Sequence, residues 1–303
     1  MATVNKRVGL PQATVINGVD AGGTMLAVIN AGYDNLMYSS PDGLEVPLKD
    51  KECQFVRGTI TTQDWAVAVN LLTGVVGTYV FYERKSGVAA ATGYVQHTIT
   101  APVIHRMSIN LTKGGYSAIT FDFECRAADE TVTIAAMWAV LDSQAAPTYI
   151  PAARGGYRVE TAVHGVDPNN IDIYHVTAFN FTLTLPLVKD CNDADVAYTC
   201  VDARLDGLTA GGSISFQAGE VTGAILTCQE LIAAAAAALV LVVTQSQGAA
   251  DKTVTIANVD FNSIGSSSSV NAPFTEYTAA FDVANDVTTQ LTLAGDNKII
   301  AIV

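Results

Sequence analysis

The stretch Val15-Ile16-Asn17-Gly18-Val19-Asp20 decides how this chain of 303 residues is organised, because a similar stretch occurs again in its second half. The second occurrence is Ala162-Val163-His164-Gly165-Val166-Asp167. Both place small and β-branched residues around a central glycine, a composition typical of a strand that runs into a turn. Such a recurrence predicts a duplicated β-rich unit.

Later landmarks recur in the same order. They are three pairs of segments: Gly58-Thr59-Ile60 with Gly212-Ser213-Ile214, Thr98-Ile99 with Thr255-Ile256, and Ser117 to Phe123 with Tyr277 to Val283. The last pair aligns Phe121-Asp122 with Phe281-Asp282. The offset varies between pairs, as it does when insertions fall in loops. The collinear order predicts two domains, residues 1–150 and 151–303, joined near a stretch with prolines and small residues.

The composition excludes several classes of protein. Half of the residues are hydrophobic and only 15% are charged, which predicts oligomeric contacts that cover apolar surface. The longest apolar run, Leu231 to Val243, is shorter than the ~20 residues of a spanning helix, so no membrane partner is expected. The N-terminus lacks the apolar core of an export signal, which predicts assembly in the cytoplasm.

The chain is acidic and the charge is uneven. The net charge is −13, with −3 in residues 1–151 and −10 in residues 152–303. An acidic surface repels nucleic-acid phosphates, so the composition argues against a protein that grips DNA. A role in which DNA slides past without specific binding remains compatible with it.

The predicted fold class is mainly β: two tandem sandwich or barrel domains, each with one principal helix. Strands are expected at residues 78–82, 107–111, 118–125, 131–134, 177–185 and 253–256. The helices are expected from Thr62 to Leu72 and around the helical spacing Val221, Ile225, Cys228 and Ile232. Paired glycines such as Gly211-Gly212 are interpreted as turns, and Ser266 to Ser269 as a flexible loop.

No residue pattern predicts catalysis. There is no nucleophile elbow, no phosphate-binding glycine loop and no zinc-binding cysteine or histidine spacing, so no catalytic residue, cofactor or metal is assigned. The five cysteines are interpreted mainly as small core residues. The four histidines are expected at the surface or at an interface. Asp190, Asp193 and Asp195 lack a complete calcium-loop pattern, and a solvated acidic loop is the favoured interpretation.

Each half also carries a long, less regular stretch between an early strand and its helix. The first runs from Gly32 to Lys51 and the second from Pro186 to Asp206. Loops of this length in compact domains are usually functional or flexible.

The layout resembles the tail tube proteins of long-tailed bacteriophages. The segments that carry the resemblance are Gln54-Phe55-Val56-Arg57-Gly58-Thr59-Ile60, the helix expected after it, Tyr79-Val80-Phe81-Tyr82-Glu83, and the strands up to Cys125. Residues 160–284 repeat this layout more faintly. The resemblance implies a β-sandwich or barrel whose sheets join edge to edge into rings. The rings stack into a hollow tube that conducts genome DNA.

A chain with two copies would then build a ring that imitates sixfold symmetry from three subunits. The partners implied are further copies of the chain, other tail proteins such as tape measure and terminator, and DNA that passes through the lumen; the location implied is the virion tail. The long loops would contact the neighbouring ring. The residues matched for this role are Tyr33, Leu36, Tyr38, Leu44, Leu187, Val188, Asp190, Asp193 and Asp195. The alternatives are a capsid decoration or other virion surface protein, and a cell-surface adhesin or pilus module.

Overall fold

The computed structural model describes residues 7–16, 19–20, 24–38, 48–62, 78–85, 92–113, 118–125, 132–146, 157–165, 170–191, 199–203, 208–217, 221–245, 251–268, 274–284 and 298–303. These residues confirm the predicted mainly β class. The first helix, expected from Thr62 to Leu72, lies almost wholly outside them.

The strands of the first half are β1 (Arg7–Ile16), β2 (Val19–Asp20), β3 (Thr24–Tyr38), β4 (Leu48–Thr62), β5 (Tyr79–Lys85), β6 (Tyr94–Ile99), β7 (Pro102–Thr112), β8 (Ala118–Cys125) and β9 (Trp138–Gln144). Those of the second half are β10 (Tyr157–His164), β11 (Ile171–Ile173), β12 (Val176–Thr184), β13 (Leu187–Cys191), β14 (Thr199–Ala203), β15 (Thr209–Gln217), β16 (Ala237–Gln245), β17 (Lys252–Ser267), β18 (Glu276–Val283) and β19 (Ile300–Ile302). The helices are α2 (Ile134–Met137) and α3 (Val221–Ala233).

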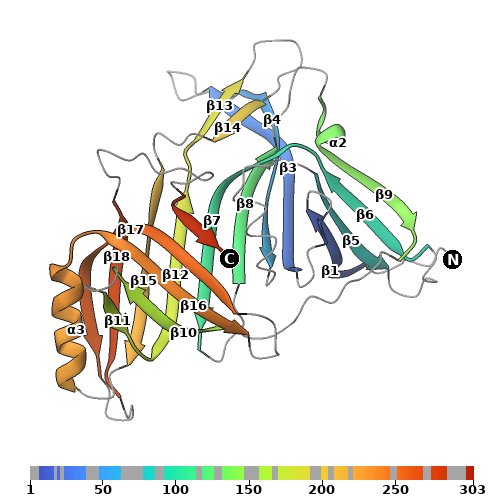
Figure 1. The fold of residues 1–303 in the computed structure, drawn as a ribbon. Coiled ribbons are helices and arrows are strands. Elements are labelled where there is room, and N and C mark those ends of the chain that lie inside the picture. Colours follow the sequence, from blue (N-terminus) through green and yellow to red (C-terminus); the bar gives the residue numbers. More distant parts are fainter. Residues whose placement is uncertain are drawn as a thin grey trace.

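One long antiparallel sheet runs through both halves of the chain (Figure 1). Its strand order is β11-β10-β16-β17-β18-β15-β12-β7-β8-β4-β3, and β19 pairs with β17. A second sheet has the order β2-β1-β5-β6-β9, and β13 and β14 form a separate hairpin. In Figure 1, α3 lies at the end of the molecule formed by β17 and β18.

The strand order repeats between the two halves. In residues 7–146, here called repeat 1, the orders are β2-β1-β5-β6-β9 and β3-β4-β8-β7. In residues 157–303, repeat 2, the same places are taken by β11-β10-β16-β17-β19 and β12-β15-β18-β17. The single strand β17 therefore occupies in repeat 2 the sheet positions that β6 and β7 occupy together in repeat 1.

The residue-by-residue register repeats as well. The break between β6 and β7 lies at Ala101, which has a φ of 50°, and its counterpart within β17 is Asn258, with a φ of 49°. The echo of Thr98-Ile99 at residues 255–256 fits this register. The sequence match of Phe121 with Phe281 is wrong by two residues. Gly58 pairs with Phe123, and its counterpart Gly212 pairs with Phe281. Phe123, not Phe121, is thus the counterpart of Phe281.

Gly58 and Gly212 are glycines because another strand passes too close for a side chain. A Cβ atom would lie 2.2 Å from the Val28 carbonyl oxygen at Gly58 and 2.0 Å from the Asn180 carbonyl oxygen at Gly212. A phenylalanine ring covers each position, Phe123 or Phe281, at 2.9 Å. The interpretation of Gly211-Gly212 as a turn is therefore wrong, since both lie within β15.

The core lies against one face of the long sheet, and alternation along each strand produces it. In β6, buried and half-buried residues alternate over Tyr94–Ile99, as expected for a strand with one buried face. Phenylalanines dominate the shared interior: Phe121, Phe123, Phe179, Phe181 and Phe281 are each at most 1% exposed.

Two local expectations need correction, and a third is confirmed. Residues 132–134 do not form part of the strand expected at 131–134, because Thr133 caps α2 by accepting a hydrogen bond from the Ala136 backbone N–H. Ser266 and Ser267 belong to β17, where they pair with Tyr277 and Glu276 of β18. The helical spacing from Val221 is confirmed as α3.

Candidate functional site

The two repeats are joined by a strand pair that behaves as part of the core. Strand β12 pairs antiparallel with β7 over seven residue pairs, from Ala178 with Thr112 to Thr184 with Arg106. On the core side, Phe181 lies opposite Ile109, and both are 0% exposed. On the other side, Asn180 Nδ2 donates a hydrogen bond to Asn110 Oδ1 at 2.5 Å. This pair fuses the repeats into one sheet, and it is called the junction below.

The junction uses one edge from each repeat, and the equivalent edges remain open at the ends of the sheet. The counterpart of β12 is β3, and that of β7 is the part of β17 from Val259 to Ser267. Among the described residues, β3 pairs only with β4, and residues 260–267 of β17 pair only with β18, while Val259 also pairs with Ala237 of β16. An open edge presents unpaired backbone donors and acceptors along its length.

These edges carry few of the features by which monomeric proteins usually protect an edge, although each has a register irregularity, between Phe261 and Ser263 in β17 and between Tyr33 and Asn35 in β3. Such edges are commonly short, or carry charged residues and proline. Strand β3 is 15 residues long with Asp34 as its single charged residue, and residues 259–267 of β17 contain only Asp260. The two open edges are therefore suited to pairing with another strand.

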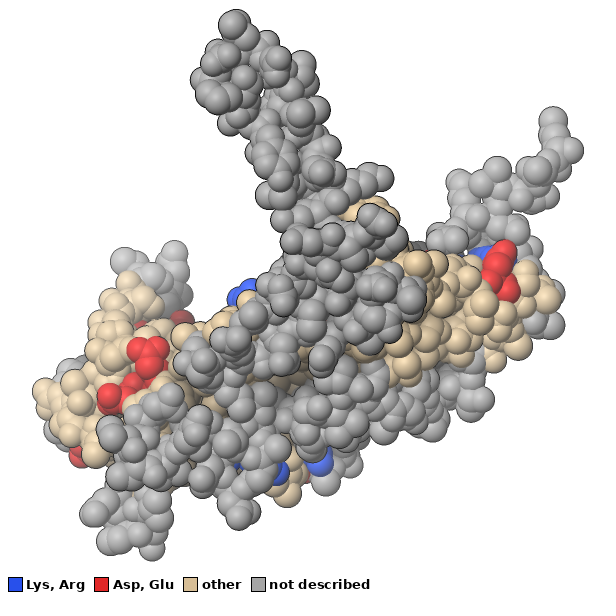
Figure 2. All heavy atoms as spheres, turned by 90° about the horizontal axis from the view of Figure 1, so that it is seen from above, with Lys and Arg blue, Asp and Glu red and all other residues tan. Residues whose placement is uncertain are grey.

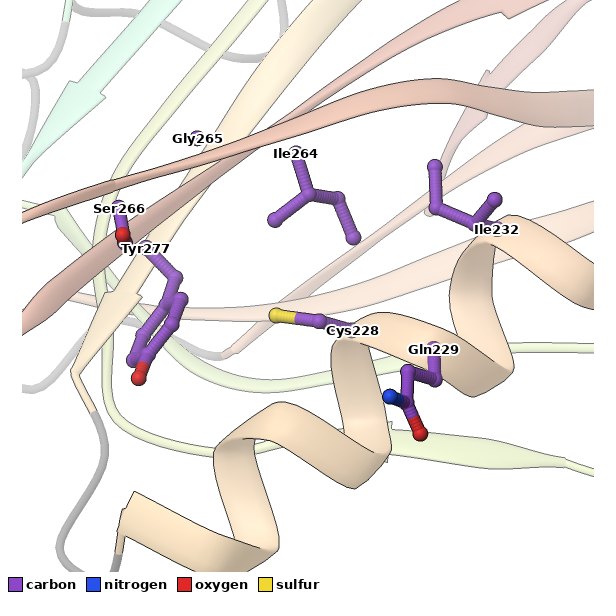
Figure 3. A pocket seen from close by; sticks show the side chains of 7 residues that line it. All are labelled: Cys228, Gln229, Ile232, Ile264, Gly265, Ser266 and Tyr277. Atoms are coloured by element: carbon purple, nitrogen blue, oxygen red, sulfur yellow. The ribbon is translucent and has the colours of Figure 1, made fainter.

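A hollow of about 440 Å³ lies beside the open edge of β17 (Figure 3). Ile264, Gly265 and Ser266 of β17 line one side, Tyr277 of β18 lies next to them, and Cys228 reaches towards them from α3. Partial burial raises the pKa of the Cys228 thiol. The hollow is thus mainly apolar, with a neutral thiol at its wall.

The same place in repeat 1 is sealed by the junction. By the repeated register, Ile264 and Ser266 correspond to Met107 and Ile109 of β7. Those two residues are 1% and 0% exposed, because β12 lies alongside them. The hollow in repeat 2 is therefore open where repeat 1 is covered by a neighbouring strand.

The outward face of the long sheet carries many hydroxyl and amide groups together with charged side chains such as Asp122, Asp282 and Arg106, and is called the polar face below. Its cross-strand contacts include Thr61 with Thr120 at 3.2 Å, and Ser215 with Thr278 at 2.9 Å. Asn262 Nδ2 donates a hydrogen bond to Asp282 Oδ2 at 2.7 Å. In Figure 2, most of the described surface is neither acidic nor basic, and described acidic side chains show near the two ends of the body.

The residues predicted to contact a neighbouring ring lie on hairpins rather than loops. Tyr33, Leu36 and Tyr38 belong to β3, which pairs with β4 as far as Tyr38 with Leu48. Leu187, Val188 and Asp190 belong to β13, which pairs with β14. The expectation of irregular loops is wrong for these parts, because backbone pairing with a partner strand orders them. Leu44, Asp193 and Asp195 lie outside the described residues.

The structure brings these two hairpins to the same end of the long sheet. Strand β14 packs against β4 and β7, and Figure 1 shows β13 and β14 beside the end of β4. Tyr33 is 42% exposed. The sequence order alone matched these segments by position in each half, but did not predict that they would lie side by side.

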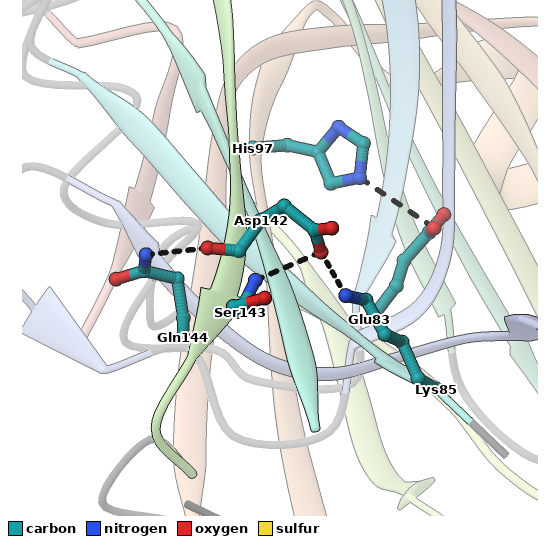
Figure 4. A network of polar contacts seen from close by, with 6 residues as sticks. All are labelled: Glu83, Lys85, His97, Asp142, Ser143 and Gln144. Carbon is teal, nitrogen blue, oxygen red and sulfur yellow. Dashed lines mark hydrogen bonds and ion pairs between the residues drawn. The ribbon is translucent and has the colours of Figure 1, made fainter. Parts of the chain in front are cut away.

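Two of the four histidines are buried, so the expectation of surface histidines is wrong for them. His97 is 3% exposed and His164 is 1% exposed. His97 stacks on Phe81 with ring centroids 4.5 Å apart, and accepts a hydrogen bond at Nδ1 from Trp138 Nε1 at 3.1 Å. Its Nε2 therefore carries the proton and faces Glu83 at 3.5 Å (Figure 4).

These contacts fasten β5, β6 and β9 together. Next to His97 in Figure 4, Lys85 pairs with Asp142, whose carboxylate also accepts a hydrogen bond from the Ser143 backbone N–H. His164 Nε2, on β10, lies 3.0 Å from the Val259 carbonyl oxygen of β17. In the sheet, β16 lies between these two strands. Both histidines thus serve to pack sheets.

Within the described part of the chain, no three His, Cys, Asp or Glu side chains gather to hold a metal ion. Over the same residues, no helix is long and apolar enough to cross a membrane. Comparison of the sequence with models of protein families gives no match, and comparison with curated proteins gives none either. The junction and its two open counterparts, whose edges carry unpaired backbone groups, are the candidate functional site.

Proposed function

We propose that the chain is a structural virion protein, the subunit of a tail tube of a long-tailed bacteriophage. In this proposal three chains supply six repeats to each ring, and rings stack into a hollow conduit for DNA ejection. The protein is assembled in the host cytoplasm and resides in the virion tail. It has no catalytic role.

The junction is the observation that carries this proposal. Two repeats of one chain already lie edge to edge in one sheet, with buried aromatic and aliphatic residues behind the paired strands. Head-to-tail contacts of this kind generate rings when the rotation between units closes. A chain that contains two units and two further open edges is suited to extend the same sheet.

The polar face supports a conduit for DNA. Hydroxyl and amide side chains such as Thr61, Asn110 and Ser215 are bonded to neighbours across the strands and carry no charge. Together with a net charge of −13, such a face offers few fixed cations to phosphates. We propose that this face lines the lumen, past which DNA moves without specific binding.

The hairpins at one end of the sheet suit contacts between stacked rings. Tyr33, Leu36 and Tyr38 on β3, with Leu187, Val188 and Asp190 on β13, are the residues we assign to this contact. At the two ends of the tube the same surfaces would meet other tail proteins, such as tape measure and terminator.

Electron microscopy of the purified full chain tests the function. The expected result is hollow rings with threefold symmetry that stack into tubes as the protein is concentrated. Monomers alone at every salt and protein concentration would contradict the proposal. Isolated trimers that never stack would instead favour a capsid surface protein.

A further inference from the structure

We infer that the open edge of β17 in one copy of this chain pairs with the open edge of β3 in the next copy, in the register of the junction. The inference rests on the proposed function only in that both require copies of the chain to assemble. It adds which two strands meet, in which direction, and which residues lie opposite each other.

The strand directions are compatible with this pairing. Every neighbouring pair from β3 through β7 and β12 to β17 is antiparallel. Because eight strands alternate along this path, β3 and β17 run in opposite directions. Placing β17 of one copy beside β3 of the next therefore continues the antiparallel order without a break.

The repeated register fixes the residues that would meet. Ile29 pairs with Gly58 as Phe181 pairs with Gly212, so Ile29 is the counterpart of Phe181. Ser266 is the counterpart of Ile109, which lies opposite Phe181 in the junction. The inference thus places Ile29 of the next copy opposite Ser266.

This register directs an apolar side chain into the hollow. Ile29 lies on the core side of β3, where it packs against the buried cluster of repeat 1. Ser266 and Tyr277 lie opposite each other on the core side of repeat 2 and line the hollow with Cys228. A neighbouring Ile29 would therefore cover the hollow, as Phe181 lies opposite Ile109 inside the chain.

The packing around the edges does not obstruct the pairing. Strand β1 packs near β3, but its counterpart β10 packs in the same way near β12 and leaves room for β7. At Gly265, an added Cβ would have no atom within 4 Å. On the outward side, Val28 is 40% exposed, and Ser263 and Ser267 are exposed.

Cysteine cross-linking of the full chain tests the register. Val28 and Ser267 are the counterparts of the paired Asn180 and Asn110, so the inference places them opposite each other on the polar face. Paired positions on antiparallel strands lie about 5 Å apart, within reach of a disulfide. Within one chain the two edges are seven strand spacings apart, about 34 Å, so a disulfide between positions 28 and 267 must join two copies.

The variant carries Val28→Cys with Ser267→Cys, and its matched control carries Val28→Cys with Ser263→Cys. In the control, the two cysteines are out of register by four residues, about 13 Å along the strand. The yield of the 28–263 disulfide should therefore be at least about tenfold lower than that of the 28–267 disulfide. Mild oxidation, a non-reducing gel and mass spectrometry of the peptides identify the link apart from the natural cysteines. The expected product is a 28–267 disulfide between copies. When oxidation is complete, these disulfides should join three copies into a covalently closed trimer.

Micrographs of the same samples separate the two proposals. Tubes without the 28–267 link, or with 28–28 or 267–267 links in its place, would overturn the register while leaving the tube. A 28–267 link without stacked rings would support the register and contradict the tube. A sample that shows neither tubes nor the 28–267 link would overturn both proposals.

Discussion

Replacement of Gly212 by alanine should destabilise the folded chain more than replacement of Gly58, its counterpart in repeat 1. The added Cβ would lie 2.0 Å from the Asn180 carbonyl oxygen at Gly212 and 2.2 Å from that of Val28 at Gly58. Ordinary contact begins near 3.4 Å, so a strand must move by about 1.4 Å or 1.2 Å. These shifts are similar, and the surroundings decide the difference.

The strand in the way is held differently at the two positions. At Gly212 it is β12, which has β15 on one side and β7 on the other. At Gly58 it is β3, which among the described strands pairs only with β4. Strand β3 can therefore move outward, whereas β12 can move only by disturbing the junction.

The magnitudes follow from two opposing terms. Overpacking costs about 1–3 kcal/mol, and occasionally more. Removing a glycine from a strand returns about 0.5–1 kcal/mol of backbone entropy. With the overpacking cost near the top of its range at Gly212 and lower at Gly58, we expect a net loss of about 2 kcal/mol for Gly212→Ala and about 1 kcal/mol for Gly58→Ala. Gly265→Ala, which meets no atom within 4 Å, should be neutral or slightly stabilising.

Urea unfolding of dilute protein, followed by circular dichroism, measures all three variants against the wild type. For a chain of this size, about 2 kcal/mol also corresponds to a fall of roughly 4 °C in the melting temperature. The reasoning is refuted if Gly212→Ala unfolds within about 0.5 kcal/mol of the wild type. It is equally refuted if Gly265→Ala is as destabilising as Gly212→Ala.

Three further predictions concern the edge, the junction and a buried thiol. Ile29→Lys should abolish assembly in sedimentation experiments because its charge would enter the hollow, whereas Val28→Lys, on the polar face, should still assemble; equal assembly of both would contradict this. Phe181→Ala should cost about 3–5 kcal/mol in urea unfolding, while Leu141→Ala, 51% exposed, should stay within about 0.5 kcal/mol. Burial raises the pKa of the Cys125 thiol to about 12 from 9.0, because the folded chain disfavours the charged thiolate. The stability that the buried neutral thiol contributes is therefore complete below pH 9 and is lost as the pH rises towards 12. Urea midpoints between pH 8 and pH 11 should therefore fall less steeply in Cys125→Ala.

Local patterns predicted the strands well where one face is buried. The alternation of residues 118–125 and the spacing from Val221 correspond to β8 and α3. They failed where a distant partner decides the structure. Ser266 has a loop composition, yet Tyr277 of β18 holds it in a strand. The Gly211-Gly212 pair has the composition of a turn, yet the approach of β12 explains the glycine at position 212.

The candidate interface was beyond the reach of sequence patterns for a similar reason. The junction joins residues such as Asn110 and Asn180, which are 70 positions apart, and nothing in either strand marks the other as its partner. The echoes predicted two units, and the strand order of the structure repeats between the two halves of the chain. Which edges meet, and which stay open, depends on how the sheets pack in three dimensions.

The two kinds of edge differ in composition, and the difference has a physical reason. The junction forms within one chain, so it can be strongly apolar, with Met107, Ile109 and Phe181 buried behind it. The open edge of β17 carries Ile264 and Ser266 at the places of Met107 and Ile109. A free chain with the larger apolar residues there would expose them to solvent before it met a partner. In the proposed assembly, contacts between copies would rely more on backbone pairing and on one aliphatic side chain, so that each would be weaker than the junction. Assembly through such edges should proceed cooperatively, since a closed ring satisfies every edge while an open dimer leaves two exposed.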